Sequence, residues 1–351
     1  MAKITAGGDI NKGDLINKGK YPVIANGLNN NGIVGYSNKY KIDAPAVTIT
    51  GRGTLGVATA RFINFTPIVR LISIKSDLDP IYLENVINNT HFVIESTGVP
   101  QLTAPQVKRQ TVILSNCHIE QTKIGSLFLT LDNAITLHEE KKRQLERLKS
   151  ALLQKMFADK SGYPPVRFEG FSDKWEQVKY GEIFQRRSKM GVSTPTLPSV
   201  EYDDINPGMG TLNKEPKSKG ISKRGIYFNP GDVLFGKLRP YLKNWLFACF
   251  EGVAVGDFWV LTSSKIDHGF TYSLIQTPGF QYIANLSSGS KMPRSDWGLV
   301  SNARTFIPIN HLEQERISSV LFGLDHAITL YEHKLEILNK IKSFLLQNMF
   351  I

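Results

Sequence analysis

Residues 131–157 read LDNAITLHEEKKRQLERLKSALLQKMF, and residues 324–350 read LDHAITLYEHKLEILNKIKSFLLQNMF. The two stretches lie 193 positions apart, and 16 of their 27 aligned residues are identical. The likeness continues upstream, where Glu120-Gln121 matches Glu313-Gln314. A repeat this long and this far apart indicates a duplicated unit rather than a solenoid of short modules.

Both copies have the pattern of a long amphipathic helix. Apolar residues recur at alternating spacings of three and four, neither copy contains proline, and Asn310 with Glu313 forms a capping-box pattern. Roughly 40 residues at about 1.5 Å each would give a rod of roughly 60 Å. An apolar stripe must be buried, and the other copy is the obvious partner. We expect the helices to pair through Ile124, Leu127, Leu131, Leu145, Leu148, Leu152, Ile317, Leu324, Tyr331, Leu335, Leu338, Ile341 and Leu345.

The remaining sequence is rich in short β-prone runs, such as Ala46–Thr50 and Ile68–Ile74, separated by Gly and Asn turns. The predicted fold class is α+β. Two mixed, β-rich domains are expected to be separated by two long helices, which pack as an antiparallel coiled coil with internal pseudo-two-fold symmetry. The predicted boundaries are residues 1–115 for the first domain, 116–157 for the first helix, 158–165 for a linker, 166–309 for the second domain and 310–351 for the second helix.

Composition limits the classes of function. Lys and Arg outnumber Asp and Glu by 42 to 31, which gives a net charge of +11 and favours a polyanionic partner, above all nucleic acid. Cys117 and Cys249 are the two cysteines, so no disulfide framework or thiolate metal site is expected, and a reducing cytoplasm fits. The apolar runs are too short to span a bilayer. We therefore expect a cytoplasmic protein with no membrane partner.

Motifs for nucleotide binding fail on inspection. Gly51–Gly56 has the dinucleotide-binding glycine spacing, but a β-prone run follows it where the motif needs a helix, so a tight hairpin with Arg52 at its tip is predicted. Gly231–Lys237 resembles a phosphate-binding loop, but Leu238 stands where Ser or Thr should reach magnesium. No nucleotide site is expected in this chain.

Motifs for catalysis and metal binding are also unconvincing. Glu139-Glu140-Lys141 contains the end of a nuclease pattern but lies on a helix surface, where solvated charges are ordinary. The seven histidines lack zinc-protease spacing, and packing in the helix seam explains His138 better than metal ligation. The sequence therefore predicts neither catalytic residues nor a metal site.

Basic and amide side chains on turns remain as candidates for DNA contacts. Lys and Arg neutralise phosphates, whereas Arg and Asn can also hydrogen-bond base edges in pairs. Taken singly, each is as well explained by an ordinary solvated surface, so the inference rests on the ensemble. The candidates are Lys12, Lys18, Lys20, Asn26, Asn29, Lys39, Arg52, Thr54, Arg61, Arg186, Arg187, Lys217, Lys219, Lys223, Arg224, Lys237, Arg239, Lys243, Lys291 and Arg294.

The repeated helix and its flanking motifs resemble the specificity subunits of type I restriction-modification systems. The likeness lies in the Glu-Gln-x-basic-Ile, Leu-Asp-x-x-Ile and Leu-Leu-Gln-x-Met-Phe motifs of both helices. Pro165–Phe171 resembles the segment that opens a domain in that family, and Thr50–Gly56, Gly98–Leu102 and Gly236–Pro240 resemble internal signatures. The first domain departs from the pattern, since Met1 aligns near Ile183 or Phe184 and the opening segment has no counterpart there.

The resemblance implies a non-catalytic DNA reader. Each domain would read one half of a bipartite, asymmetric target in double-stranded DNA, and the helices would set the gap. Two methyltransferase subunits, which bind S-adenosylmethionine and methylate adenine N6, and two ATP- and magnesium-dependent translocase-nuclease subunits would be the partners. The chain itself would bind no cofactor.

Two other classes of function fit parts of the sequence. A coiled-coil DNA-binding regulator that self-dimerises would explain the charge and the heptads, but not an internal duplication with non-identical domains. A stand-alone nuclease or methyltransferase would require a catalytic site of an unrecognised kind.

Overall fold

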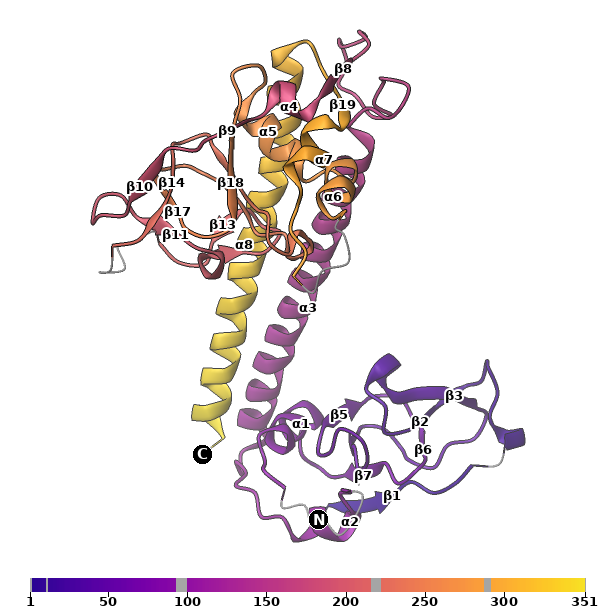
Figure 1. The fold of residues 1–351 in the computed structure, drawn as a ribbon. Helices are drawn as coiled ribbons and strands as arrows, with labels where there is room; N and C mark the ends of the chain where they lie inside the picture. The colour runs from indigo at the N-terminus through magenta and orange to yellow at the C-terminus, as the bar shows by residue number, and fades with distance from the viewer. Residues whose placement is uncertain (1, 11, 93–99, 216–221, 287–291, 351) are drawn as a thin grey trace. The chain divides into compact units, whose positions relative to one another are not determined.

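The computed structural model describes residues 2–10, 12–92, 100–215, 222–286 and 292–350. The chain forms two compact units (Figure 1). Unit 1 comprises Met1–Glu139 and Lys334–Ile351, and unit 2 comprises Glu140–His333. Each of the two long helices therefore contributes to both units, so the units do not follow the domain boundaries expected from the sequence.

Unit 1 contains two small sheets and a covering helix. The first sheet has the order β1-β7-β4-β5, and the second has the order β3-β2-β6. The elements are β1 (Lys3–Ala6), β2 (Tyr21–Ile24), β3 (Ile33–Ser37), β4 (Ala46–Ile49), β5 (Ala58–Arg61), β6 (Thr66–Pro67), β7 (Ile72–Lys75), α1 (Pro80–Asn88) and α2 (Ala104–Arg109), with short 3₁₀ turns at Lys12–Asp14 and Asn29–Gly32.

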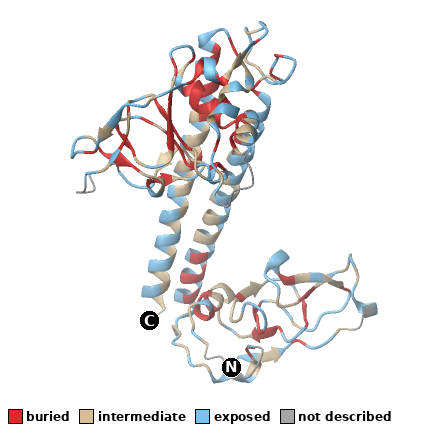
Figure 2. Ribbon diagram, viewed as in Figure 1, coloured by how far each residue is buried: buried red, intermediate tan, exposed pale blue. Residues whose placement is uncertain are grey.

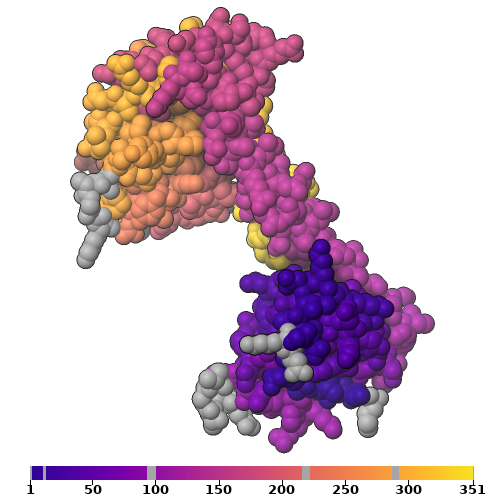
Figure 3. Space-filling model, turned by 90° about the vertical axis from the view of Figure 1, so that its right-hand side faces the viewer, coloured from indigo at the N-terminus to yellow at the C-terminus, as the bar shows by residue number. Residues whose placement is uncertain are grey.

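The core of unit 1 lies between its first sheet and α1. Val47, Ile49 and Ile72 on the sheet are almost fully buried against Leu83 and Ile87 of the helix. The Asp79 side chain caps α1 by accepting a hydrogen bond from Tyr82 N–H, and Pro80 fits the first turn, where no backbone donor is needed. The first domain, indigo in Figure 3, therefore closes its own hydrophobic core.

Unit 2 repeats this plan with more elements. Its strands are β8 (Glu176–Lys179), β9 (Gln185–Arg186), β10 (Met190–Val192), β11 (Ser199–Val200), β12 (Ile205–Asn206), β13 (Thr211–Leu212), β14 (Arg224–Phe228), β15 (Val233–Gly236), β16 (Trp245–Phe247), β17 (Gly252–Ala254), β18 (Phe258–Thr262) and β19 (Arg304–Ile307). Its helices are α4 (Tyr180–Ile183), α5 (His268–Ile275), α6 (Pro278–Ala284) and α7 (Trp297–Asn302), with 3₁₀ turns at Tyr202–Asp204 and Pro240–Leu242.

The main sheets of the two units correspond strand by strand. In unit 2 the order is β16-β15-β18-β9, with the same antiparallel neighbours as β5-β4-β7-β1 in unit 1. Helix α5 follows β18 as α1 follows β7, and Asp267 caps it by accepting from Phe270 N–H. The duplication seen in the helices therefore extends into both domains.

Helices α3 (His118–Lys155) and α8 (His311–Met349) run antiparallel wherever they meet within a unit. In unit 1 Asp132 pairs with Lys342, and in unit 2 Lys142 pairs with Glu332. The α+β class predicted from the sequence, with two mixed β-rich domains and two long paired helices, is confirmed.

The stripe that the helices bury differs in part from the predicted one. Leu127, Leu148 and Ile341 are 40%, 48% and 42% exposed, which makes them the most exposed of the residues expected to pair the helices. The partly buried row instead includes Lys142 and Lys149, whose ammonium groups pair with carboxylates of α8. The other ten predicted positions are buried or partly buried.

The ends of the helices are buried in the domains. In unit 1, Phe350 packs with Tyr82 and Phe128, and the buried positions of α3 gather at its start, beside α1 (Figure 2). In unit 2, Phe157 stacks on Phe270 and meets Trp175. Each domain is therefore bound both to the start of its own following helix and to the end of the other helix.

Candidate nucleic-acid interface

A hairpin loop between β15 and β16 projects from the main sheet of unit 2. The loop spans residues 237–243 and contains two left-handed residues, Arg239 (φ 48°) and Lys243 (φ 59°). Pro240 is buried, whereas Arg239, Tyr241 and Lys243 are exposed. Non-glycine residues in this conformation cost about 1–3 kcal/mol each and persist where the surroundings hold them. The loop is thus a fixed shape that presents cations to solvent.

Three neighbouring segments hold the loop. Lys237 N–H donates to Asp257 O (2.9 Å), and Arg239 N–H donates to Pro293 O (2.7 Å). The Tyr202 hydroxyl donates to Asp257 O (2.7 Å) and accepts from Leu238 N–H (3.1 Å). Burial, as the main cause, raises the pKa of Tyr202 to about 12, so it stays a neutral donor at physiological pH.

A carboxylate organises the basic side chains beside this loop. Nε and Nη2 of Arg294 donate to Asp257 Oδ2 at 3.1 and 3.0 Å, and Lys237 Nζ lies 3.6 Å from Asp257 Oδ1. The Arg294 side chain is 56% exposed to solvent. Asp257 therefore fixes one edge of the guanidinium and leaves its remaining N–H donors available to solvent.

In unit 1 the corresponding hairpin joins β4 and β5. Ile49 pairs with Ala58, and Thr50 N–H donates to Val57 O at 3.0 Å, so the hairpin predicted for this glycine-rich stretch is confirmed. Arg52 and Thr54 are exposed in its loop. Gly51 is required for close packing, because a Cβ there would lie 2.7 Å from Leu102 O and 3.0 Å from Arg70 O.

The supports of the two hairpins correspond. Asn26 Oδ1 accepts from Gly51 N–H (2.7 Å), and in unit 2 the Tyr202 hydroxyl accepts from Leu238 N–H, one residue further along its hairpin. Leu102 N–H donates to Gly51 O (3.0 Å), as Ser295 N–H donates to Lys237 O (2.8 Å). Each domain thus brings an arginine-bearing hairpin together with the segment that precedes α2 or α7.

Four predicted DNA contacts are occupied inside the protein. The amide of Asn26 uses its other end to donate to Val69 O (2.6 Å), so it braces the first hairpin. Arg61 donates to Thr48 Oγ1, and its pKa is lowered mainly by burial. Arg187 forms a bidentate pair with the fully buried Asp232, and Lys223 bonds both oxygens of Glu201. Each of these four side chains therefore has a partner within the protein.

The other predicted positions have varied surroundings. Arg186 stacks over Trp297 at 4.6 Å, and Lys20 lies over Tyr21 at 5.4 Å. The candidates exposed away from the hairpins are Lys18, Asn29, Lys39 and Arg224. Lys12 lies in the first 3₁₀ turn. Lys217, Lys219 and Lys291 lie outside the described residues. The structure gathers Arg52 and Thr54 at one hairpin, and Lys237, Arg239, Lys243 and Arg294 at the other.

Sequence reasoning missed three residues beside the hairpins. Asp257 was passed over because it is acidic, although it positions Arg294. Gln101 lies in the segment held by Gly51, one residue before Leu102, and its place in a Gly-Val-Pro-Gln-Leu stretch was the available signal. Arg70 is exposed in a left-handed conformation (φ 62°) within a run predicted as strand, so nothing marked it.

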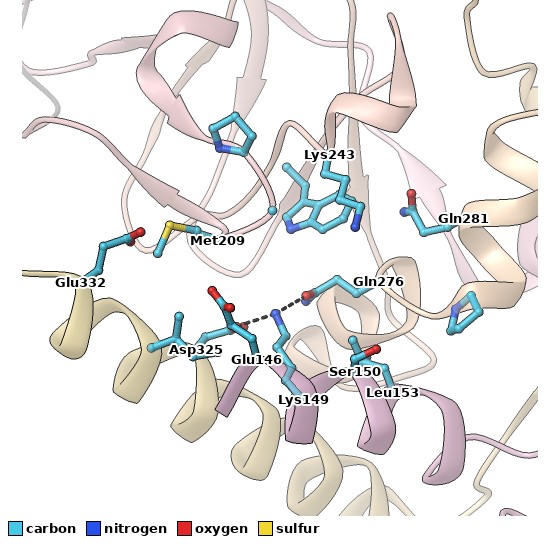
Figure 4. Close-up of a pocket in the computed structure, with 15 residues that line it drawn as sticks. Glu146, Lys149, Ser150, Leu153, Met209, Lys243, Gln276, Gln281, Asp325 and Glu332 are labelled. Atoms are coloured by element: carbon cyan, nitrogen blue, oxygen red, sulfur yellow. Dashed lines mark hydrogen bonds and ion pairs between the residues drawn. The ribbon is translucent and has the colours of Figure 1, made fainter. Parts of the chain in front are cut away.

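A groove in unit 2 lies between the domain and the helices (Figure 4). Its volume is about 490 Å³, and Lys149 crosses its floor between Gln276 (2.7 Å) and Asp325 (2.5 Å). Burial raises the pKa of Asp325, although Lys149 opposes that shift. Lys149 pairs with Asp325 Oδ1, whereas Asp325 Oδ2 and Trp245 Nε1 are buried in the same lining without a hydrogen-bond partner in the described part of the chain.

Metal-binding clusters and membrane-spanning helices are not found among the described residues. Within the described ranges, no group of three His, Cys, Asp or Glu side chains is placed to hold a metal ion. Among those same residues, no helix has the length and apolarity needed to cross a membrane. Both cysteines are exposed and unbonded to each other.

Comparisons with known proteins find one matching family model and several relatives. Residues 1–147 match the family model described as the type I restriction modification DNA specificity domain. Two Mycoplasma pneumoniae proteins assigned as type I specificity subunits, S.MpnORF507P and S.MpnORF89P, are each 28% identical to this chain, over 110 and 91 residues. Those alignments cover 31% and 25% of this chain and 30% and 27% of the relatives, so the chain matches less than a third of their length.

A solved structure extends the likeness to the whole chain. The crystal structure of a type I restriction-modification S subunit from M. genitalium superposes with a TM-score of 0.70 at 15% identity, covering 100% of this chain and 94% of the other. Residues 1–147 are therefore similar to the type I restriction-modification DNA specificity domain, and the whole chain shares the fold of the solved S subunit.

Proposed function

We propose that this chain is the sequence-specific DNA-binding subunit of a type I restriction-modification complex. Each domain reads one half of a bipartite, asymmetric target in double-stranded DNA. The chain itself performs no catalysis, and it acts in the cytoplasm.

The observation that carries this proposal is the pair of hairpins. Both domains hold an exposed arginine, Arg52 or Arg239, in the hairpin loop that follows the equivalent strand of the main sheet. Two domains that share one fold but carry different surface residues suit two different half-sites. The net charge of +11 favours the phosphate backbone of either half.

Partners supply the chemistry in this proposal. Two methyltransferase subunits bring S-adenosylmethionine and methylate adenine N6, and two translocase-nuclease subunits bring ATP and magnesium. The long helices give such partners two similar faces, because α3 and α8 are copies of one sequence.

Sequencing of methylated adenines tests the proposal. The chain is co-expressed with its methyltransferase subunit in a host that lacks adenine methylation, and modified sites are mapped across the genome. We expect one bipartite motif with a fixed gap and two different halves. A palindromic motif, or methylation by this chain alone, would contradict the proposal.

Helix length offers a second, independent test. If α3 and α8 set the gap between the half-sites, insertion of one heptad at equivalent points of both helices lengthens the rod by about 10 Å. We expect the mapped motif to keep both halves and to change its gap. An unchanged gap would show that the helices do not determine spacing.

A further inference from the structure

The segments beside the two hairpins place one pair of residues at equivalent positions. Thr103 and Asp296 are the N-caps of α2 and α7. The residue before each cap, Leu102 or Ser295, donates its N–H to the hairpin backbone. One step earlier lie Gln101 in unit 1 and Arg294 in unit 2, so the two side chains leave the backbone at the same point beside their hairpins.

Asp257 holds one edge of the Arg294 guanidinium, and the opposite edge can donate further hydrogen bonds. Asp257 accepts from Nε and Nη2, which leaves both hydrogens of Nη1 and one of Nη2 unused by that carboxylate. The Asp257 carbonyl in turn accepts from Lys237 N–H and the Tyr202 hydroxyl, so the carboxylate is carried on a fixed backbone. Two parallel N–H donors of this kind match O6 and N7 of guanine in the major groove.

Unit 1 has different chemistry at the same two places. Ile49 pairs with Ile72 as Phe235 pairs with Trp259, which puts Arg70 at the position of Asp257. The residue at that position is therefore a cation instead of a carboxylate, and the residue equivalent to Arg294 is the amide Gln101. An amide both accepts and donates, which matches N6–H and N7 of adenine rather than two acceptors of guanine.

We propose that Gln101 and Arg294 are equivalent specificity residues, with Gln101 reading an adenine in one half-site and Arg294 reading a guanine in the other. Asp257 is a positioning residue for Arg294. This inference rests on the proposed function, because it assigns bases within the two half-sites that the domains read.

Exchange of the two side chains tests the inference. The complex of the chain with its methyltransferase subunit selects duplexes from randomised DNA, and the wild type is compared with Gln101→Arg and Arg294→Gln. Arg294→Gln should lose a guanine preference at one position of one half-site by about 10- to 100-fold, the equivalent of about 1–3 kcal/mol. Gln101→Arg should change one adenine position in the other half-site alone.

Asp257→Asn provides the matched test of positioning. The amide keeps the size of the side chain but pairs with Arg294 more weakly, so discrimination at the Arg294 position should fall with an unchanged thermal midpoint. Binding to DNA that lacks the guanine should change little, which a merely structural defect would not produce.

Several outcomes would overturn the inference. If the variants keep the wild-type motif, neither residue reads a base. An equal loss of affinity on all sequences would mean that the side chains contact phosphate. Both results presuppose that the wild type selects a bipartite motif. If the wild type selects no motif, the proposed function fails first and the inference falls with it.

Discussion

One ion pair occurs in both units with its partners exchanged. In unit 2 Lys149 pairs with Asp325, and in unit 1 Asp132 pairs with Lys342. Asp325 is the copy of Asp132, and Lys342 is the copy of Lys149, each 193 positions later. Antiparallel pairing of two copies of one helix requires such an exchange, because residue i of one copy then meets residue j of the other.

The surroundings of the two pairs differ. The Lys149 and Asp325 side chains are 11% and 13% exposed, whereas those of Lys342 and Asp132 are 29% and 44% exposed. Gln276 adds a hydrogen bond to Lys149 in unit 2. In unit 1 the carboxyl of Glu84 lies near the pair instead, and burial raises its pKa. The duplicated helices therefore kept their pairing geometry while the domains around them diverged.

Removal of the carboxylate from each pair should give the largest difference in the free energy of unfolding between the two units. Asp325→Ala leaves Lys149 buried without its anion, and we expect a loss of about 3 kcal/mol in the free energy of unfolding. The equivalent Asp132→Ala should cost no more than about 1 kcal/mol, because exposed pairs are weak. Urea unfolding followed by circular dichroism measures both.

A double variant serves as the control. Lys149→Met combined with Asp325→Leu removes both charges and should recover most of the stability lost in Asp325→Ala. Equal losses for the two single variants would show that burial does not distinguish the pairs.

Substitution of two equivalent buried glutamines should lower the free energy of unfolding by amounts that differ less between the units than those of the ion pairs. Gln314 donates to Pro308 O and accepts from Asp267 N–H, both at 2.8 Å. Gln121 donates to Ser115 O at 2.8 Å, and Asp79 N–H approaches its Oε1 at 3.5 Å. Substitution by Ala should cost about 2 kcal/mol for Gln314 and about 1 kcal/mol for Gln121, since the second contact of Gln121 is longer. Thermal unfolding of the two variants compares them, and a larger loss for Gln121 would contradict the equivalence.

Ionisation of Glu84 should have a smaller effect, seen in how the free energy of unfolding depends on pH. Because burial raises its folded pKa above the ordinary 4.5, Glu84 favours folding below that pH and loses this contribution as pH rises through its folded pKa. Glu84→Gln keeps an acceptor for Ala60 N–H. The stability of the wild type relative to this variant should therefore fall as pH rises from 4 to 8. A flat difference across that range would argue against a raised pKa.

The sequence predicted the helices because their repeat and period are local properties of the chain. The choice of inward residues was less accurate. Leu148 is more apolar than Lys149, yet Lys149 faces inward because Asp325 and Gln276 lie there to receive it. A pairing between residues so far apart in sequence leaves no local pattern, and this is why the inward position of Lys149 was not predicted.

The site shows the same limit. The β4–β5 hairpin followed from the β-prone run after the glycines, where a nucleotide-binding motif would need a helix, and Arg52 is exposed in its loop. Arg187 and Arg294 could not be told apart by sequence, since each meets a carboxylate only through folding. Arg187 meets the fully buried Asp232, whereas Arg294 meets the partly exposed Asp257 and stays open to solvent.

The most direct test of two equivalent reading heads is target mapping with Arg52→Ala and Arg239→Ala, each co-expressed with the methyltransferase subunit. We predict that each variant relaxes the sequence of one half-site only, by about 1–3 kcal/mol, and that the two variants affect opposite halves. Relaxation of the same half by both variants, or of both halves by either one, would contradict the account.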